Sequence, residues 1–272
     1  MTCPCDVERP RRDASWHCVG GFSNPDPGVV AKLGRAQPGA WSIAQIEFKV
    51  VPTAGSGVEM ATLLRVAQRS AHAWNSHAPS RGVPMIRVTG AEEDLLEDDA
   101  EAVQDGENQV IVRTRNVEAC YDAARQATTH LYRGLSNGDL VEADIEINGV
   151  DPRWLQPGGG VNVDRLHALL AHEWGHVLGL DHSCGLLRTR GIVGAGAGVA
   201  CDDQRALKSI MFPDPFTPAR ALVLEPTPDD LAALHALYPT LPAVSSTSAT
   251  VVIALLVGAC FLGGWLVRWR RP

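Results

Sequence analysis

One stretch of the sequence, HEWGHVLGLDH, begins at His172 and carries residues that could bind a metal ion. On a helix, His172 and His176 lie four positions apart and point the same way, so both imidazoles can bind one ion. Glu173 can reach a metal-bound water without being a ligand itself. Gly179 can end the helix in a backbone conformation that residues with a Cβ resist. The chain can then double back, so that His182 supplies a third ligand.

Three protein ligands leave one position open for water, which is typical of a catalytic zinc. Zinc lowers the pKa of its bound water toward about 7. Glu173 would take the proton of this water as it attacks a peptide carbonyl, and would then protonate the leaving amine. The spacing therefore predicts a zinc-dependent endopeptidase, with Glu173 as general base and three zinc ligands: His172, His176 and His182.

Other interpretations of these residues stay open. A bare H-E-x-x-H pattern also occurs by chance in helices, although Gly179 and His182 at this spacing argue against that. One alternative function is a non-proteolytic zinc amidase acting on cell-wall peptides. The other is a non-catalytic surface binding module. Glu173 argues against this module, because a structural zinc has no use for a base beside it.

The run HEWGHVLGLDHS resembles the zinc motif of the metzincin metallopeptidases, and its GLDHS ending resembles the matrixin branch. The resemblance implies a methionine-containing turn beneath the zinc, which SIMFP fits with Met211. It also places the wall of the S1′ specificity pocket just after this methionine, beginning with Phe212 and Pro213. Astacin-like and serralysin-like relatives carry a tyrosine where this chain has Pro213, which again favours matrixins.

The chain departs from the matrixin pattern between the histidines and the methionine. Met211 follows His182 by 29 residues, much farther than in typical matrixins. Cys184 and Cys201 bracket the insert. We expect a disulfide between them, with two unrelated thiols as the alternative, and a disulfide would predict an extracytoplasmic domain. No His-rich loop like that of animal matrixins is visible, so their structural zinc is unsupported. The inhibitory pro-segment cysteine motif of the family is also not visible.

The elements that must position these residues follow from hydrophobic periodicity and capping signals. Asn162 or Asp164 is expected to cap the N-terminus of the motif helix. Thr227 is expected to cap the last helix, with Pro228 in its first turn. The strand VEADIEING is expected to have one solvated face. The patterns predict strands at 43–51, 84–88, 109–114 and 141–149, and helices at 58–77, 121–132, the motif and 227–239.

These elements predict an α+β fold of the zincin or metzincin type. Its parts are a twisted mixed sheet, an active-site helix, a Met-turn and a C-terminal helix, all within 41–240, after an irregular Cys- and Pro-rich segment at 1–40. The formal net charge of -7 disfavours nucleic acid as a partner, so the expected partner is a protein or peptide substrate. The Arg-rich, lysine-poor composition suggests a GC-rich bacterial gene.

Several acidic residues and histidines outside the motif are expected to be structural. The acidic segment at 91–108 is expected to be a solvated loop or surface helix, with a calcium site as the alternative. Asp144, Asp151 and Asp164 are expected to serve a strand edge, a turn and a cap rather than a metal. His167 lies off the ligand face of the motif helix and is expected to be a core or surface histidine.

The C-terminal part predicts a membrane anchor. A linker at 241–248 precedes the apolar segment 249–267, whose 19 residues would span roughly 28 Å as a transmembrane helix. The basic tail at 268–272 would then be cytoplasmic, and the catalytic domain would lie outside. No secretory signal is visible in 1–40, which conflicts with this orientation. We favour a start upstream of Met1 as the explanation, with unconventional export or a cytoplasmic domain with reduced cysteines as the alternatives.

Overall fold

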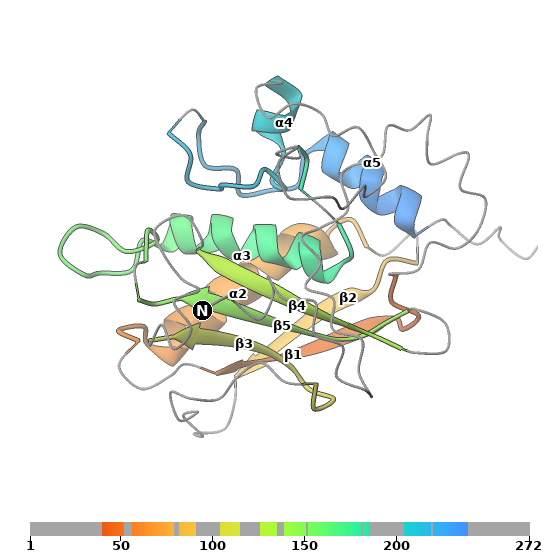
Figure 1. The fold of residues 1–272 in the computed structure, drawn as a ribbon, viewed down its shortest axis with the longest axis horizontal. Helices are drawn as coiled ribbons and strands as arrows, with labels where there is room; N and C mark the ends of the chain where they lie inside the picture. Colours follow the sequence, from red (N-terminus) through yellow and green to blue (C-terminus); the bar gives the residue numbers. More distant parts are fainter. Residues whose placement is uncertain are drawn as a thin grey trace, which may run out of the picture. The chain divides into compact units, whose positions relative to one another are not determined.

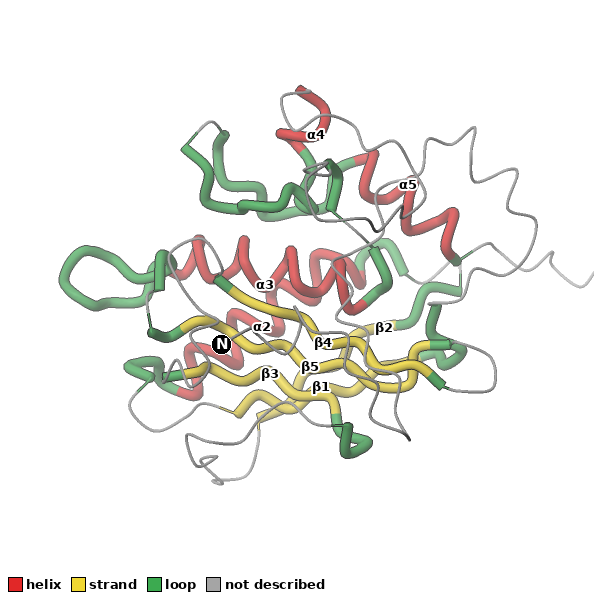
Figure 2. Tube along the Cα trace, in the orientation of Figure 1, coloured by secondary structure: helices red, strands yellow, loops and turns green. Residues whose placement is uncertain are grey.

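A five-stranded mixed sheet, with strand order β2-β1-β3-β5-β4, forms the base of the molecule (Figures 1 and 2). β1 pairs in parallel with β2 and β3, β3 pairs in parallel with β5, and the terminal strand β4 runs antiparallel to β5. The strands are β1 (Gln45–Val51), β2 (Met85–Gly90), β3 (Asn108–Arg113), β4 (Ala127–Arg133) and β5 (Leu140–Asn148).

The structure is a computed structural model, and all the residues it describes belong to the first of two units, Met1–Pro239 and Thr240–Pro272. The described residues are 40–51, 56–78, 82–90, 104–114, 126–134, 139–150, 152–180, 182–184, 204–218 and 220–238.

Two long helices, α2 (Met60–Asn75) and α3 (Val163–Val177), pack against each other and against the sheet. Buried tryptophans join them. The indole N–H of Trp74 donates to the carbonyl of Ala171 at 2.7 Å, and that of Trp174 donates to Ser70 Oγ at 2.9 Å. Trp174 also meets Phe48 of β1 edge to face, with ring centroids 4.8 Å apart. This core fixes α3 on the sheet.

Two shorter helices follow in the chain, α4 (Gln204–Lys208) and α5 (Pro228–Leu237). Figure 1 shows α3 between the sheet and the segment that carries α4 and α5. Thr227 caps α5 as predicted, in a reciprocal capping box with Asp230. Asn162, one of the two expected caps, begins α3 by accepting a hydrogen bond from the backbone N–H of Arg165.

The prediction of a helix at 121–132 is wrong over its second half, because Ala127–Arg133 is strand β4. Alanine and arginine in this stretch suit a helix, whereas Thr128, Thr129 and Tyr132 suit a strand. Antiparallel pairing with β5 along nearly the whole of β4 decides between them. The first half of the predicted helix, at 121–125, lies outside the described residues.

The prediction that β5 has one solvated face is also wrong. Glu142, Asp144 and Glu146 are only 2%, 2% and 8% exposed, although they alternate with apolar residues. Partners compensate their burial. Glu142 accepts hydrogen bonds from two backbone N–H groups, Asp144 accepts one from Gln109, and Glu146 pairs with Arg113. An alternating pattern identifies two chemically different faces of a strand, and in β5 neither face is exposed to solvent.

Several predictions concern segments beyond the described residues. These are the N-terminal segment at 1–39, the acidic stretch at 91–103, Asp151, most of the insert after Cys184, and the linker, anchor and tail from 241 onward. Within the described ranges, no helix is both long and apolar enough to cross a membrane.

Candidate metal centre

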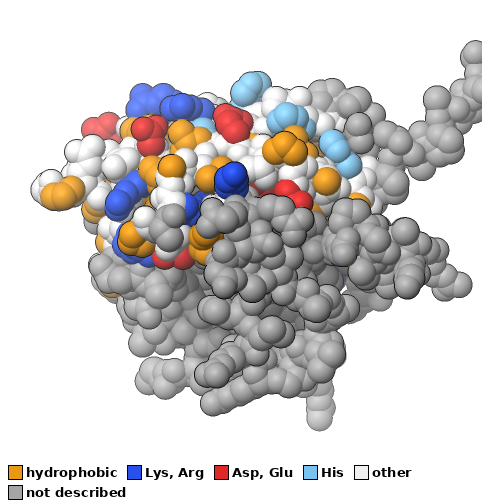
Figure 3. Space-filling model, turned by 90° about the horizontal axis from the view of Figure 1, so that it is seen from above, with side chains coloured by type: hydrophobic (Ala, Val, Ile, Leu, Met, Phe, Trp, Pro, Cys, Tyr) orange, Lys and Arg blue, Asp and Glu red, His pale blue; other side chains and the backbone are white. Residues whose placement is uncertain are grey.

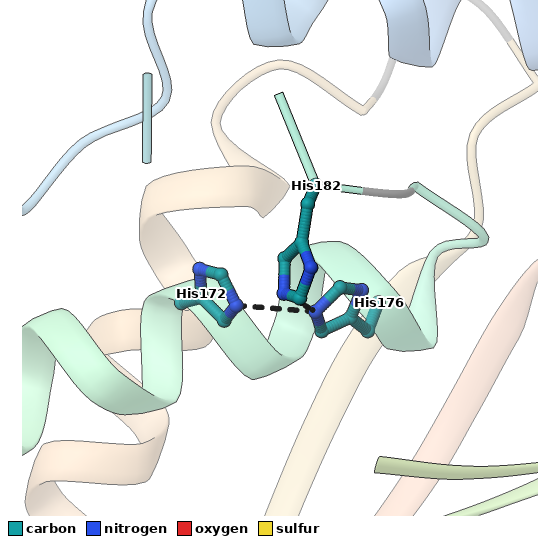
Figure 4. Close-up of side chains that lie close together, drawn as sticks. All are labelled: His172, His176 and His182. Carbon is teal, nitrogen blue, oxygen red and sulfur yellow. Dashed lines mark hydrogen bonds between the residues drawn. The ribbon is translucent and has the colours of Figure 1, made fainter. Parts of the chain in front are cut away.

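Three histidine side chains converge at the C-terminal half of α3 and the turn that follows it (Figure 4). His172 and His176 lie one turn apart on α3 and are buried. Their Nε2 atoms are 3.1 Å apart, and Nε2 of His176 is 3.2 Å from Nε2 of His182. One potential ligand atom from each ring lies within 4.8 Å of the others. No other such group occurs among the described residues.

A sharp turn after α3 brings His182 to this position. Gly179 adopts a φ of 90°, which is left-handed backbone that favours glycine. The N–H of Gly179 donates to the carbonyl of His176, and the N–H of Leu180 donates to that of Gly175. These bonds close the helix end in the manner of a Schellman turn. The chain reverses within a few residues, as the spacing predicted.

The end of α3 is held by residues from both ends of the folded unit. The indole N–H of Trp41 donates to the carbonyl of Val177 at 2.7 Å. The hydroxyl of Tyr238 donates to the carbonyl of Leu178 at 3.1 Å and accepts from the backbone N–H of Trp41. All these groups are buried, so the helix end and the turn toward His182 cannot shift independently of the core.

Backbone carbonyls orient two of the histidine rings. Nδ1 of His172 lies 2.8 Å from the carbonyl oxygen of Ile210, and Nδ1 of His176 lies 2.8 Å from that of Leu180. A carbonyl can only accept, so each Nδ1 must carry the proton, which leaves a lone pair on each Nε2. Two lone pairs 3.1 Å apart repel each other, and a cation between them removes this repulsion. The ring orientation therefore fits a metal ion.

Burial keeps these imidazoles neutral. It lowers the pKa of His176 to about 4, and with the neighbouring His176 it lowers that of His182 to about 3. Burial, followed by the charges of the two other histidines, lowers the pKa of His172 well below its usual value. Neutral imidazole is the form that binds metals, so all three are ready as ligands at pH 7. His182 is half-buried, which places the cluster at the surface of the fold. Figure 3 shows histidine side chains reaching the surface over one part of the upper face, away from most Lys and Arg side chains.

Glu173 follows His172 on α3 and is 4% exposed. Burial raises the pKa of its carboxyl to about 7, and a hydrogen bond from Thr129 acts in the opposite direction. The Thr129 hydroxyl donates to Oε2 of Glu173 at 2.6 Å. A carboxyl with a pKa near 7 suits a group that takes and returns a proton. Sequence reasoning missed Thr129, because its segment was predicted to be a helix and a lone threonine gives no other signal.

Met211 packs against α3 at Gly175, between the two helical histidines. Its Sδ occupies the space where a Cβ on Gly175 would be, so the glycine between the two helical histidines is required by packing. The carbonyl of Ile210 contacts His172, and the carbonyl of Met211 accepts from the N–H of Ser183 at 2.8 Å. The turn thus contacts both α3 and the loop of His182. The position of Gly175 between the two histidines of the motif is the sequence signal that could have identified it as a packing residue.

Asp230 of α5 holds this turn from the other side. Its buried carboxylate accepts hydrogen bonds from the hydroxyl of Ser209 and from the N–H of Ile210. It also accepts from the N–H and the hydroxyl of Thr227, at 2.8 and 2.6 Å. One carboxylate therefore ties the Met211 turn to the start of α5.

Phe212 and Pro213 follow Met211 directly in the chain. Phe212 is buried beside Cys184 and Ala206, and the guanidinium of Arg220 lies 5.3 Å from its ring centre. Pro213 is half-buried. Cys184 is disulfide-bonded, but Cys201 lies outside the described residues, so their pairing stays a prediction.

Arg153 fixes the far end of this segment. It donates from one nitrogen to both carboxylate oxygens of Asp214 at 3.1 Å, and from another to the carbonyl of Phe216 at 2.7 Å. The guanidinium groups of Arg153 and Arg165 also approach the Phe216 ring, at 5.4 and 5.6 Å. The segment that leads into α3 is therefore fastened to the one that follows the Met211 turn.

The residues expected to be structural lie apart from the cluster. His167 is buried, and its Nε2 lies 3.0 Å from the carbonyl oxygen of Leu224. Asp164 is in the first turn of α3, where a carboxylate is favourable. Asp144 lies on β5 and accepts a hydrogen bond from the backbone N–H of Gln109. None of these side chains is part of the three-histidine group.

No protein-family model matches the sequence, and no curated protein matches it. Among solved structures, the chain is similar to metalloproteinase-II from Bacteroides fragilis, with a TM-score of 0.36 and 14% sequence identity. The alignment covers 72% of this chain and 53% of that protein, so the chain spans about half of its length. What the site can do therefore has to be inferred from the histidines and Glu173.

Proposed function

We propose that this protein is a zinc-dependent endopeptidase of the metzincin type, with a matrixin-like site. The observation that carries the proposal is the convergence of three neutral imidazoles, together with a buried carboxylate on Glu173, the residue that follows the first of them on α3. Three nitrogen ligands that leave a position open are the usual set for a catalytic zinc. His172, His176 and His182 would hold the ion. When bound, zinc supplies a Lewis acid that polarises a peptide carbonyl and makes water acidic.

Glu173 would perform the proton transfers. An oxygen of its carboxylate takes a proton from water as the water oxygen bonds to the peptide carbonyl carbon. The same carboxyl then gives this proton to the peptide nitrogen as the C–N bond breaks, so the products are a carboxylic acid and an amine. The pKa of about 7 lets the carboxyl serve in both directions near neutral pH.

The terminal strand β4 would bind the substrate. It is the last strand of the sheet order and contributes Thr129 to the contact with Glu173, so this edge of the sheet runs past the cluster. An extended peptide adding to this edge would bring its backbone to the histidines. Phe212 and Pro213, which follow the Met211 turn, would line the pocket for the side chain after the cleaved bond.

Replacing the base tests the proposal. Glu173→Ala should retain one zinc per chain and lose at least about 100-fold in kcat on a casein-type protein, because the proton acceptor is gone while the ligands stay. Metal analysis and a fluorescent-casein assay measure the two quantities. Undiminished hydrolysis by the variant would refute the mechanism. Cleavage of peptidoglycan fragments but of no protein would show a cell-wall amidase instead.

A further inference from the structure

Thr129 is the residue that holds the carboxylate of Glu173. Its hydroxyl donates to Oε2 at 2.6 Å, and the two side chains are 6% and 4% exposed. No other described residue donates a hydrogen bond to this carboxylate. A hydroxyl has a single proton and can engage only one of the two carboxylate oxygens. The second oxygen, Oε1, stays available for another partner.

The sheet, and not a loop, sets the position of Thr129. In the antiparallel register of β4 with β5, Thr129 lies opposite Ile145, which is fully buried. Residues directly opposite each other share a face of the sheet, so the Thr129 side chain points to the face that α3 covers, and that of Thr128 points away. α3 packs against β4 and is itself fixed by the tryptophan contacts with α2. Both partners of the contact are therefore on rigid elements.

Such a contact matters because a glutamate side chain is long. Its carboxylate can be displaced by more than an ångström through side-chain rotation, and small displacements of a reacting group have large effects on rate. Among the described residues, the Thr129 hydroxyl is the one hydrogen-bond donor to the Glu173 carboxylate, and this bond opposes the rotation.

We propose that Thr129 is a positioning residue: by fixing Oε2, it directs Oε1 of Glu173 toward water at the three-histidine cluster. The inference rests on the proposed function for its kinetic consequence. Its structural part, the orientation of the Glu173 carboxylate, can be tested without any turnover. It also gives β4 a second role, because the strand expected to bind the substrate would at the same time aim the base.

The decisive variant is Thr129→Val, which keeps the shape and the β-branch but removes the hydroxyl. We expect zinc content and KM close to those of the wild type and a kcat about 10- to 100-fold lower, the range found when outer hydrogen-bond partners of a metal site are removed. Thr129→Ser restores the hydroxyl and should restore most of kcat. Thr62→Val, the same change on α2 and outside the substrate-binding strand, is the matched control and should leave kcat unchanged. Thr129→Ala replaces the valine variant if that one does not fold.

Crystal structures of the zinc-loaded wild type, Thr129→Val and Thr129→Ser give a readout that is independent of activity. The Glu173 carboxylate should leave its position in the valine variant and keep it in the serine variant. An unmoved carboxylate in Thr129→Val, an unchanged kcat, or a serine variant as impaired as the valine variant would each overturn the inference. A zinc-loaded wild type that hydrolyses no peptide would refute the proposed function alone, since the crystal structures would still decide the role of Thr129.

Discussion

The three histidines of the cluster differ in how firmly the fold holds them. The rings of His172 and His176 are fixed by a regular helix and by backbone carbonyls, whereas His182 stands on the short turn after Gly179 and is half-buried. His182 can therefore be removed with the least damage to the core. It is the best position at which to separate metal binding from folding.

His182→Ala should weaken zinc binding by at least about 100-fold, because losing a ligand should cost no less than losing one of its outer partners. Its melting temperature without metal should stay near that of the wild type. Competition with a chromophoric chelator measures the affinity. His72→Ala is the matched control, because His72 is exposed on α2. Equal zinc affinity of the two variants would exclude His182 as a ligand.

Gly175→Ala should destabilise the protein, although alanine usually stabilises a helix by up to about 1 kcal/mol relative to glycine. The added Cβ would meet Met211 Sδ and come within 3.0 Å of the Trp74 ring. Overpacking of this kind typically costs about 1–3 kcal/mol, so the steric term should win.

Urea unfolding measures the change in the free energy of unfolding. Gly160→Ala is the control, because a Cβ there would meet nothing within 4 Å. A Gly175→Ala variant as stable as the wild type would mean that Met211 can move aside, and that the turn carrying Met211 is not rigid.

The sequence predicts much of this site because the motif is local. The spacing of His172 and His176 and the turn at Gly179 follow from helix geometry, and the structure brings His182 to them as expected. Thr129 lies 44 positions from Glu173, so no local pattern joins them. Asp230 is similar: capping signals identify its place on α5, but its contact with Ile210 depends on the tertiary fold.

At the level of the secondary elements, predictions failed where tertiary contacts decide. The strands β1, β2 and β3 and the helix α2 lie where periodicity placed them, to within a few residues. The composition of β4 suits either a helix or a strand, and its pairing with β5 makes it a strand. The alternation in β5 correctly predicts a strand. The sequence does not show whether its carboxylates are solvated or accept hydrogen bonds from backbone N–H groups and Arg113, as they do in the structure.

The buried carboxylates of β5 make a prediction about stability and pH. Burial raises the pKa of Asp144 from 3.8 to about 8, and the neighbouring Glu142 adds to this. For Glu146, burial also acts to raise the pKa, but His130 and Arg113 outweigh it and hold the pKa below its usual value. Between pH 4 and pH 8 the folded protein therefore keeps a proton on Asp144 that the unfolded chain releases.

The free energy of unfolding should consequently fall as the pH rises through this window, by up to about 1.4 kcal/mol per pH unit from this group. Asp144→Asn mimics the protonated carboxyl and can still accept from the N–H of Gln109. Its melting temperature should match that of the wild type near pH 4 and exceed it near pH 8. A constant difference across this range would contradict the prediction. Calcium that stabilises the wild type but not the variant would instead identify a cation site.

For the molecule as a whole, the described unit contains every residue that the proposed chemistry uses, and the membrane anchor is a separate proposal based on the sequence. Residues 249–267 are almost all apolar and precede a cluster of arginines. A segment of this length and composition is favourable in a bilayer, and arginines beside it favour the cytoplasmic side. We therefore propose a single-pass anchor that displays the catalytic unit outside the cytoplasm.

The full chain should sediment with membranes and resist extraction by alkaline carbonate. Arginines in place of Leu255 and Leu256 should release it into the soluble fraction, because each would cost about 2.5–3.5 kcal/mol at the centre of the span. Ser246→Arg, in the linker, is the control and should stay membrane-bound. Protease added to intact cells should digest the catalytic unit of the wild type. A unit shielded until lysis would place it in the cytoplasm, where the disulfide expected between Cys184 and Cys201 would not persist.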